Sequence, residues 1–547
     1  MRFFPMEPGQ ARAHVAEAGA ALVVSLFIGG CGNNYRPVIT PVNTSGPAPQ
    51  PSAYAVVVSA PSPTTPGIVT IVDYSGDSVL VEAPVGPGPT AFTLDEVGAT
   101  GYTLNSDGTL SNFAISTTLQ AKNVSVSTLP PTAQTVNLMA PSSGLWAVDL
   151  SGDVVDLFTG SPEAFKLAIP VATATSAPTL PVFVMGFPTS TGQREYVLSQ
   201  NASDPVACNT SPATVPANGA VTPIETSSNT ADPAISLDPF ASATGSTNAL
   251  CPVFAVQTPD LKRFFVLNRG SDTISVINSQ NNTLDQCTPF TNQNGQLVTC
   301  HPILPLSLTA VSNLTADAAM PGAPSGIPTA PPNGTAGMTS SAGPVYAEYN
   351  QATQQLIVAN YDGGSISVID ASLDEYGNDS PTFGTTYTIP VGITSHPNPA
   401  SVTVLFDGSK AYTANQNDDV TGNGTGNGTV TVVNLSTHTV EKTLTVVGHP
   451  RQISSIQSSE FSKIYVASPD SPFITIIQSN PTVVDLVDTT VLTEGNVVDM
   501  RVTTQSGTTG NDNYSSRVPG YGQPCNRPGV PAPTASQTPL QACQEIP

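Results

Sequence analysis

Residues 355–370 read QLIVANYDGGSISVID, and this stretch carries the pattern that determines the fold. A short apolar strand, a polar turn and a second strand of alternating apolar and hydroxyl residues are typical of a β-hairpin. The same pattern occurs in residues 263–278 (RFFVLNRGSDTISVIN), 410–434 (KAYTANQNDDVTGNGTGNGTVTVVN) and 463–478 (KIYVASPDSPFITIIQ). The chain therefore contains an internal repeat.

Each hairpin is followed by further strands. Residues 386–392 (TYTIPVG) and 441–448 (EKTLTVVG) are predicted third strands, and residues 399–410 (PASVTVLFDGSK) lead into the next unit. The clearest copies are about 50 residues apart, within the range of propeller blades. We therefore predict an all-β propeller of four-stranded blades.

Weaker copies extend the repeat toward the N-terminus. Residues 496–502 form a lone predicted strand, whereas the first blade lacks its first strand. A C-terminal strand that joins the first blade would complete it and remove two open edges. The count is eight blades, with seven as the alternative because the third is short. The four N-terminal blades are assigned to residues 68–72 with 79–85, 89–129, 131–171 and 181–246.

The composition agrees with this fold and limits the function. Charged residues make up 10% of the 547 residues, and there are 53 prolines and 44 glycines. Abundant Thr, Ser, Val and Asn favour strands and turns over helices. The formal net charge is −23, which opposes binding to nucleic acid or to anionic lipid through a basic patch.

The N-terminal residues are predicted to be a targeting segment. Residues 18–30 (AGAALVVSLFIGG) form an apolar run of signal-peptide length. The stretch 28–31 (IGGC) resembles a bacterial lipobox, which implies that Cys31 is lipidated. A plain signal peptide and a short membrane helix with a buried cysteine are the alternatives. We expect an exported protein, in the periplasm or at the cell surface, that touches the membrane only through its N-terminal lipid.

The expected organisation is a signal peptide, a tether, the propeller and a tail. The tether is Pro-rich, and the propeller carries two insertions rich in Pro, Gly, Ser and Thr. The tail is disordered or stapled by a disulfide. These parts are residues 1–31, 32–53, 54–502 (with insertions near 200–246 and 310–344) and 503–547.

Beyond Cys31 the chain has six cysteines, and an even number in an exported chain indicates disulfides. Their spacing favours local pairs among the 15 connectivities that six cysteines allow. No CxxC pair occurs, so we do not expect a zinc site. The favoured pairs are Cys208–Cys251, Cys287–Cys300 and Cys525–Cys543.

The repeat resembles the YVTN-type β-propeller family over about residues 250–500. The resemblance implies a propeller, and similar propellers include lactonases and quinoprotein dehydrogenases with sites in the central channel. The residues that carry it are Ala359-Asn360, Ile366-Ser367-Val368-Ile369-Asp370, Ile389-Pro390-Val391-Gly392 and Asp407-Gly408.

Four basic side chains are candidates to line the channel. His396 and His449 precede prolines where the chain enters a blade's first strand, and Arg451 and Arg501 lie near first-strand positions. With His301, which occurs in a similar His-Pro context, the histidines would make a metal site. The reading we favour is that they are loop residues beside proline. No GxSxG, HExxH or Walker motif is present, so no catalytic residue is assigned.

One turn combines oxygen ligands with glycines. Asp418, Asp419 and Asn423 lie in residues 418–427, and calcium is the cation that suits such ligands. The spacing does not fit an EF-hand, and a flexible hairpin loop is the favoured alternative. No cofactor is predicted.

The sequence indicates a non-enzymatic, envelope-anchored and monomeric binding scaffold for a protein or glycan. The alternative is a lactonase-like or quinoprotein-like enzyme with a metal or cofactor in the channel. A structural envelope protein is the third interpretation. Fold alone does not separate them, because unrelated functions share propellers.

Overall fold

The structure is a computed structural model, and its described residues lie between 53 and 503. Contacts divide the chain into residues 1–50 and 51–547, and every described residue belongs to the second unit. Within 53–503 the description leaves out residues 63, 96–97, 123, 142–143, 172–178, 187–193, 202–216, 241–247, 293–294, 307–341, 395–396, 419–426, 456–462 and 480–484.

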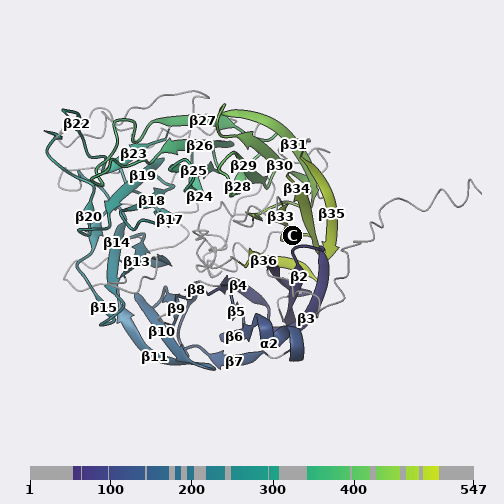
Figure 1. Cartoon of the computed structure of the whole chain (residues 1–547). Coiled ribbons are helices and arrows are strands. Elements are labelled where there is room, and N and C mark those ends of the chain that lie inside the picture. Colours follow the sequence, from purple (N-terminus) through teal and green to yellow (C-terminus); the bar gives the residue numbers. More distant parts are fainter. Residues whose placement is uncertain are drawn as a thin grey trace, which may run out of the picture. The chain divides into compact units, whose positions relative to one another are not determined.

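Eight antiparallel sheets form the blades of a propeller (Figure 1). The predicted fold is confirmed, with eight blades and not seven. Each blade runs from an inner strand beside the central axis to an outer strand at the rim. The inner strands of neighbouring blades lie side by side around the ring, in the order β36, β4, β8, β12, β17, β24, β28 and β32.

The first three blades contain the strands predicted for them, and blade 2 also contains a short helix. The composition had argued against helices, and α2 occupies only two turns between β6 and β7. Blade 1 contains β36 (Asn496–Val502), β1 (Tyr54–Ala60), β2 (Pro66–Asp73) and β3 (Ser78–Pro87); blade 2 contains β4 (Pro89–Leu94), β5 (Thr100–Asn105), β6 (Thr109–Ala114), α2 (Ile115–Ala121) and β7 (Ser125–Thr128); blade 3 contains β8 (Thr135–Met139), β9 (Leu145–Asp149), β10 (Val154–Gly160) and β11 (Glu163–Pro170).

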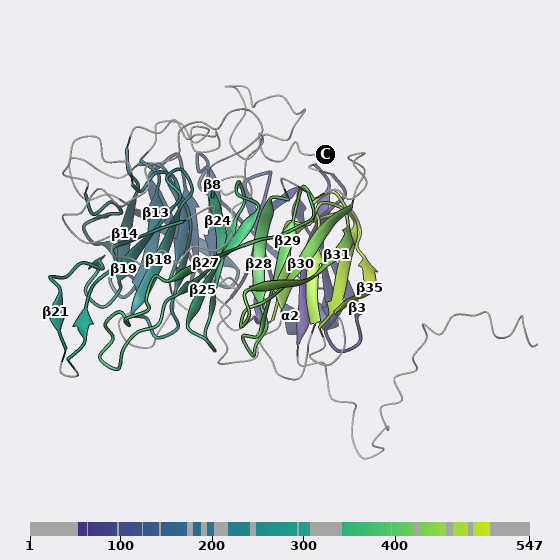
Figure 2. The ribbon, with the colours of Figure 1, turned by 90° about the horizontal axis from the view of Figure 1, so that it is seen from above.

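Blades 4 and 5 have interrupted outer strands. Residues 220–236, inside a segment predicted as an insertion, form β14 to β16 of blade 4. Blade 5 adds a hairpin, β21–β22, which stands out from the side of the ring (Figure 2). Blade 4 contains β12 (Pro181–Met185), β13 (Arg194–Ser199), β14 (Ala220–Glu225), β15 (Thr230–Ala231) and β16 (Ile235–Ser236); blade 5 contains β17 (Pro252–Gln257), β18 (Arg263–Asn268), β19 (Thr273–Asn278), β20 (Thr283–Leu284) and β23 (Ile303–Pro305), with β21 (Phe290–Thr291) and β22 (Leu297–Val298) outside the blade.

Blades 6 to 8 follow the repeat most closely. The outer strands of blades 6 and 7 overlap the predicted third strands, residues 386–392 and 441–448, and the inner strand of blade 7 lies in residues 399–410, which were expected to lead into the next unit. Blade 6 contains β24 (Pro344–Asn350), β25 (Gln355–Asn360), β26 (Ser365–Asp370) and β27 (Thr386–Pro390); blade 7 contains β28 (Pro399–Val404), β29 (Lys410–Asn415), β30 (Asn427–Asn434) and β31 (Thr439–Val447); blade 8 contains β32 (Gln452–Ser455), β33 (Lys463–Ala467), β34 (Phe473–Gln478) and β35 (Leu486–Leu492).

The two ends of the described chain meet in blade 1. Strand β36 pairs with β1, with Ala55 opposite Val502. Beyond this ladder, Thr503 donates its backbone N–H to the Tyr54 carbonyl at 2.8 Å, and the Tyr54 N–H donates to the Thr503 hydroxyl at 2.8 Å. The predicted closure is confirmed, and it removes the two open edges of an incomplete blade.

An asparagine at the end of the second strand ties the second and third strands together in blades 2, 5, 6 and 7. In blade 7 the Asn415 side-chain amide donates to the hydroxyls of Thr429 and Thr431 on the third strand, at 3.0 and 2.8 Å. We call this arrangement the asparagine clasp. It explains why the repeat needs Asn before the turn and hydroxyl residues after it. The same clasp is made by Asn105 with Thr109 and Ser111, Asn268 with Thr273 and Ser275, and Asn360 with Ser365 and Ser367.

The clasp also joins neighbouring blades. The Thr431 hydroxyl accepts the backbone N–H of Gly392, at the end of the preceding blade, at 2.9 Å. Gly392 has φ +74°, and a Cβ there would lie 2.3 Å from Pro397. Glycine is required at this close approach.

Basic residues at the start of second strands bridge blades near the rim. Lys463 donates to Asp77 at 2.6 Å, and the Tyr465 hydroxyl donates to the same carboxylate at 2.8 Å, which connects blade 8 to blade 1. Lys410 and Tyr412 contact Asp485 in the same way. Apolar side chains of facing sheets fill the space between blades and form the core.

Candidate functional site

The strands of every blade run between two ends of the ring, and these ends differ. At one end lie Tyr54 and Val502, where the described chain enters and leaves blade 1. At the other end, each second strand turns into the third, and each outer strand leads to the next blade. We call these the termini end and the loop end.

Five long connections lie at the loop end of blades 3 to 7, and residues 371–385 form a long connection at the termini end. Loops on a rigid scaffold are where binding residues are most often found. The five connections at the loop end contain no Lys, Arg or His, but they contain five aspartates. They are residues 171–180, 200–219, 237–251, 306–343 and 416–426, and their acidic residues are Asp204, Asp238, Asp317, Asp418 and Asp419.

His449 lies at the loop end, and Asp470 fixes its orientation. The Nδ1 atom of His449 pairs with Oδ2 of Asp470, and the His449 backbone N–H donates to Oδ1 at 2.8 Å. Among the described residues no group bonds Nε2, and this nitrogen is not buried from solvent. Burial raises the pKa of Asp470, but the hydrogen bonds from His449 outweigh it and hold that pKa below its usual value. The result is a carboxylate-oriented imidazole that can accept a proton from, or hydrogen-bond to, a ligand.

The preceding blade shows which part of this contact belongs to the repeat. There Asp418 accepts the backbone N–H groups of Ile393 and Thr394, at 2.8 and 2.7 Å, and the Thr429 hydroxyl also donates to it. An aspartate alone is therefore enough to accept the backbone N–H groups of the connection between two blades, and no imidazole is needed. The ring of His449 is an addition at the junction of blades 7 and 8.

Asp418 was predicted as a weak calcium ligand. Its side chain is buried, and its carboxylate holds the connection between blades. The other two predicted ligands, Asp419 and Asn423, lie outside the described residues.

The candidate channel-lining residues have separate surroundings. Arg501 is fully buried on inner strand β36, where its Nη2 donates to Asp499 at 3.1 Å. Arg451 precedes inner strand β32, and its backbone N–H donates to the Ala467 carbonyl at 2.9 Å. His396 lies outside the described residues. The role of these side chains in the channel stays a prediction.

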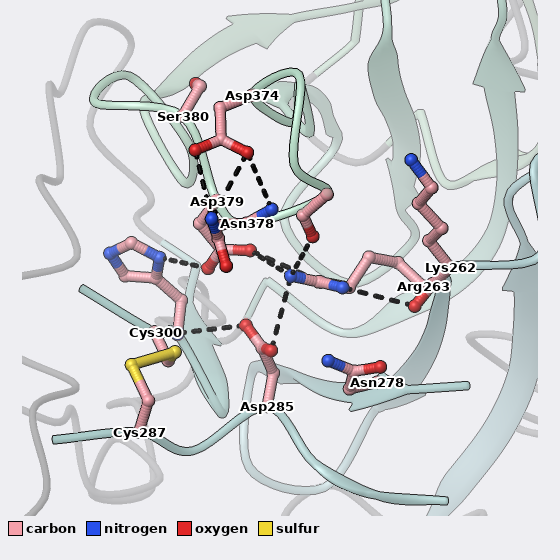
Figure 3. Close-up of polar contacts among 12 residues, drawn as sticks. Lys262, Arg263, Asn278, Asp285, Cys287, Cys300, Asp374, Asn378, Asp379 and Ser380 are labelled. Atoms are coloured by element: carbon pink, nitrogen blue, oxygen red, sulfur yellow. Dashed lines mark hydrogen bonds and ion pairs between the residues drawn. A yellow bond between two sulfur atoms is a disulfide. The ribbon is translucent and has the colours of Figure 1, made fainter. Parts of the chain in front are cut away.

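Figure 3 shows a buried charge cluster of Arg263, Asp285 and Asp379 at the junction of blades 5 and 6. His301, the third histidine in a His-Pro context, belongs to this cluster. Its Nδ1 contacts Asp379 at 2.6 Å. Arg263 donates to the same carboxylate through Nε at 3.2 Å and Nη2 at 2.8 Å, and Nη2 lies 3.4 Å from Asp285. The cluster is a variant of the Lys–Tyr–Asp bridges, because Arg263 begins a second strand and Asp379 belongs to the next blade.

The pKa values of two aspartates in this cluster are shifted in opposite directions. Burial and the neighbouring charge of Asp379 raise the pKa of Asp285 to about 7. Burial also raises the pKa of Asp379, but the contacts with His301 and Arg263 outweigh it and lower that pKa. Like charges this close do not both ionise readily, so Asp285 is the carboxyl of the two that takes up a proton first as the pH falls.

The disulfide prediction is confirmed for Cys287–Cys300, which closes the base of the β21–β22 hairpin. Cys251 is also disulfide-bonded, but its predicted partner Cys208 lies outside the described residues. Cys525, Cys543 and the lipobox Cys31 lie outside them as well.

No group of three or more His, Cys, Asp or Glu side chains among the described residues is arranged to hold a metal ion. In the same part of the chain, no helix is long and apolar enough to cross a membrane.

Sequence reasoning missed the acidic partners of the histidines. Asp470 follows His449 by 21 residues and Asp379 follows His301 by 78. The available signal was the aspartate in the turn after each second strand, as in Asn417-Asp418 and Pro469-Asp470. The sheet register was needed to show that this aspartate reaches back to the preceding blade.

No protein-family model matches the chain, and no curated protein matches its sequence. Several solved structures resemble it over most of their length, at identities and TM-scores that concern the fold alone. Apo AztD from Citrobacter koseri is 13% identical, with a TM-score of 0.45, over 82% of this chain and 97% of that chain. A putative 6-phosphogluconolactonase from Bacteroides fragilis is 12% identical, with a TM-score of 0.44, over 84% and 99%. The Pseudomonas aeruginosa periplasmic gluconolactonase PpgL is 14% identical, with a TM-score of 0.42, over 83% and 99%.

Proposed function

We propose that this protein is an exported binding scaffold, anchored to the cell envelope through Cys31, whose loop end binds an uncharged glycan. The observation that carries the proposal is the concentration of long connections at the end opposite the chain termini. The described chain begins beside Tyr54, at the termini end.

The charge of these connections supports an uncharged ligand. With five aspartates and no basic side chain, they repel phosphate, sulfate and carboxylate groups. Their Ser, Thr, Asn and Gln side chains donate and accept hydrogen bonds, as sugar hydroxyls do. An anionic ligand would need Arg or Lys, which these five connections do not supply; at the loop end, His449 and Arg451 lie in the shorter connection between blades 7 and 8.

The test is binding of the full-length chain to matched neutral and sulfated oligosaccharides by isothermal titration calorimetry. We expect binding of neutral glycans only. A variant with Thr→Lys changes in residues 306–343 should gain affinity for the sulfated forms, and the same changes at the termini end serve as the control. Preference of the unmodified chain for sulfated glycans, or binding to none, contradicts the proposal.

The His449–Asp470 pair favours a second candidate function, hydrolysis of a neutral ester or lactone. The Nε2 atom would take a proton from water as the water oxygen attacks the carbonyl carbon, and return it to the alkoxide that leaves. The test is turnover of a neutral lactone by the unmodified chain and by His449→Gln, with a loss of about 10²-fold or more expected in the variant. Equal rates in both proteins, or none above buffer, exclude this function.

A further inference from the structure

Blade 3 departs from the asparagine clasp at the positions that normally supply and accept its hydrogen bonds. In blade 7, Asn415 lies opposite Thr429, and Thr431 is two residues further. In blade 3, Asp149 lies opposite Val154, and Asp156 is two residues further. A carboxylate therefore replaces the amide donor, and a second carboxylate replaces the hydroxyl that accepts from it.

The donor from the preceding blade is also missing. At the end of blade 6, the backbone N–H of Val391 donates to the Gly364 carbonyl, and the backbone N–H of the next residue, Gly392, donates to the clasp of blade 7. At the end of blade 2, the backbone N–H of Leu129 donates to the Gly108 carbonyl, as Val391 does to Gly364. The residue after Leu129, which corresponds to Gly392, is Pro130. Proline has no N–H, so it cannot make the bond that Gly392 makes.

A fourth change adds another oxygen. The residue opposite Asp149 on the inner strand is Thr135, whereas blades 2, 4, 5, 6 and 7 have proline in the corresponding register. Residues opposite each other, or two apart on one strand, share a face of the sheet, so Thr135, Asp149 and Asp156 face the same side. The prolines are Pro89, Pro181, Pro252, Pro344 and Pro399.

These oxygens are buried, and two lack partners. Asp156 is 2% exposed and Thr135 is 4% exposed. Among the described residues, nothing hydrogen-bonds to Oδ2 of Asp156 or to Oγ1 of Thr135. Burial of an unpaired carboxylate is unfavourable. Burial and the charge of Asp149 raise the pKa of Asp156 to about 6, so the carboxylate needs a positive partner near neutral pH.

We propose that the clasp of blade 3 is a calcium site, with the Asp156 carboxylate and the Thr135 hydroxyl as ligands and Asp149 as the second negative charge. Oδ1 of Asp149 accepts hydrogen bonds from the backbone N–H groups of Gln134 and Ser151, at 2.8 and 2.9 Å, and from the Ser151 hydroxyl at 2.8 Å, so Asp149 contributes charge. The chemistry fits, because the amide donor of the clasp is replaced by a carboxylate beside two unsatisfied oxygens, and calcium binds oxygen ligands only. Water and backbone carbonyls complete such sites. The site is independent of the glycan and the hydrolase proposals.

The chain's single tryptophan provides the measurement. Trp146 lies on β9, three residues before Asp149 and opposite Leu157. Terbium replaces calcium and luminesces when a nearby excited tryptophan transfers energy to it. We expect tryptophan-sensitised terbium luminescence from the full-length chain, displaced by calcium, and a rise in Tm in about 5 mM calcium that chelator reverses.

The control rebuilds the normal clasp. The variant Asp149→Asn with Asp156→Ser restores the donor and the hydroxyl found in other blades, so it should fold, lose the luminescence and show a Tm independent of calcium. Asp419→Asn, in the other segment with candidate calcium ligands, should keep the luminescence. If the unmodified chain shows no luminescence and no calcium effect, and its Tm rises only as the pH falls below about 6, then Asp156 holds a proton and the proposal is wrong.

Discussion

The Thr413 hydroxyl donates a 2.9 Å hydrogen bond to Oδ1 of Asn415, the atom of the asparagine clasp that points away from the third strand. In blade 6 the corresponding residues are Val358 and Asn360, and the buried Oδ1 of Asn360 has no partner among the described residues. The strand register is the same in both blades. A threonine two residues before the asparagine therefore completes the clasp, and a valine leaves one acceptor unsatisfied.

We predict that Val358→Thr stabilises the protein by about 1 kcal/mol, since it satisfies a buried acceptor without a large change in volume. Urea unfolding measures the change. Val266→Thr should give a similar gain, because Oδ1 of Asn268 is also unpartnered among the described residues. A loss of stability in both variants would show that the hydroxyl does not reach the amide.

The charge cluster between blades 5 and 6 predicts a pH dependence. The pKa of Asp285 is about 7 in the folded protein, above its unfolded value, so the folded chain binds an extra proton between about pH 4 and 7. The stability that Asp285 contributes is complete below about pH 4 and is lost as the pH rises to about 7, by at most about 1.4 kcal/mol per pH unit. Asp285→Asn should remove this part of the dependence, as measured by urea unfolding at several pH values.

Asp379→Asn is the matched contrast. It leaves the buried Arg263 without the carboxylate oxygen that accepts from both Nε and Nη2, so we expect a loss of about 3–5 kcal/mol at neutral pH. Asp379 has a lowered pKa, so its contribution is lost only as the pH falls below about 4. Equal, small effects of both substitutions would show that the cluster is open to water.

Ring closure predicts the effect of truncation. A chain that ends at Thr503 keeps β36 and should unfold cooperatively at the Tm of the full-length chain. A chain that ends at Gly495 lacks the inner strand of blade 1, exposes the edge of β1 and uncovers the buried Ala55 and Val57, which pair with that strand. We expect it to aggregate or to lose cooperative unfolding in circular dichroism. A native-like transition in the shorter chain would mean that closure contributes little.

The Cys287–Cys300 disulfide should act locally. It closes a loop with a sequence separation of 13, for which the chain-entropy estimate is about 3 kcal/mol. With Cys287→Ser and Cys300→Ser, we expect limited proteolysis to cut the β21–β22 hairpin while the rest of the ring stays resistant. Cleavage throughout the propeller instead would show that the hairpin supports the whole fold.

The fold could be predicted because its signal is local. Alternating residues in 365–370 and the turn before them identify a hairpin without knowledge of other blades, and repetition then gives the propeller. Closure followed from counting strands, since residues 496–502 had no partner and the first blade lacked one. Helix α2 was missed because seven residues between two strands do not change the composition.

The contacts between blades could not be predicted, because they depend on register. His449 meets Asp470 and Arg263 meets Asp379 only after the sheets are placed side by side. Sequence identified the two histidines by the proline that follows each, which says nothing about their partners. The altered clasp of blade 3 was hidden for the same reason, since Asp149 and Asp156 become comparable with Asn415 and Thr431 only through strand pairing.

The meeting of Tyr54 and Thr503 has a mechanical consequence. A pull on the N-terminal tether would act along β1, which is hydrogen-bonded on one side to β2 and on the other to β36. Such a load would act on all the hydrogen bonds of the β1–β2 and β1–β36 pairs at once. A load on an outer strand, which is paired on one side only, could break its hydrogen bonds one at a time. Tyr54 is therefore well placed to resist force, and a chain pulled by the residues that precede it would resist unravelling.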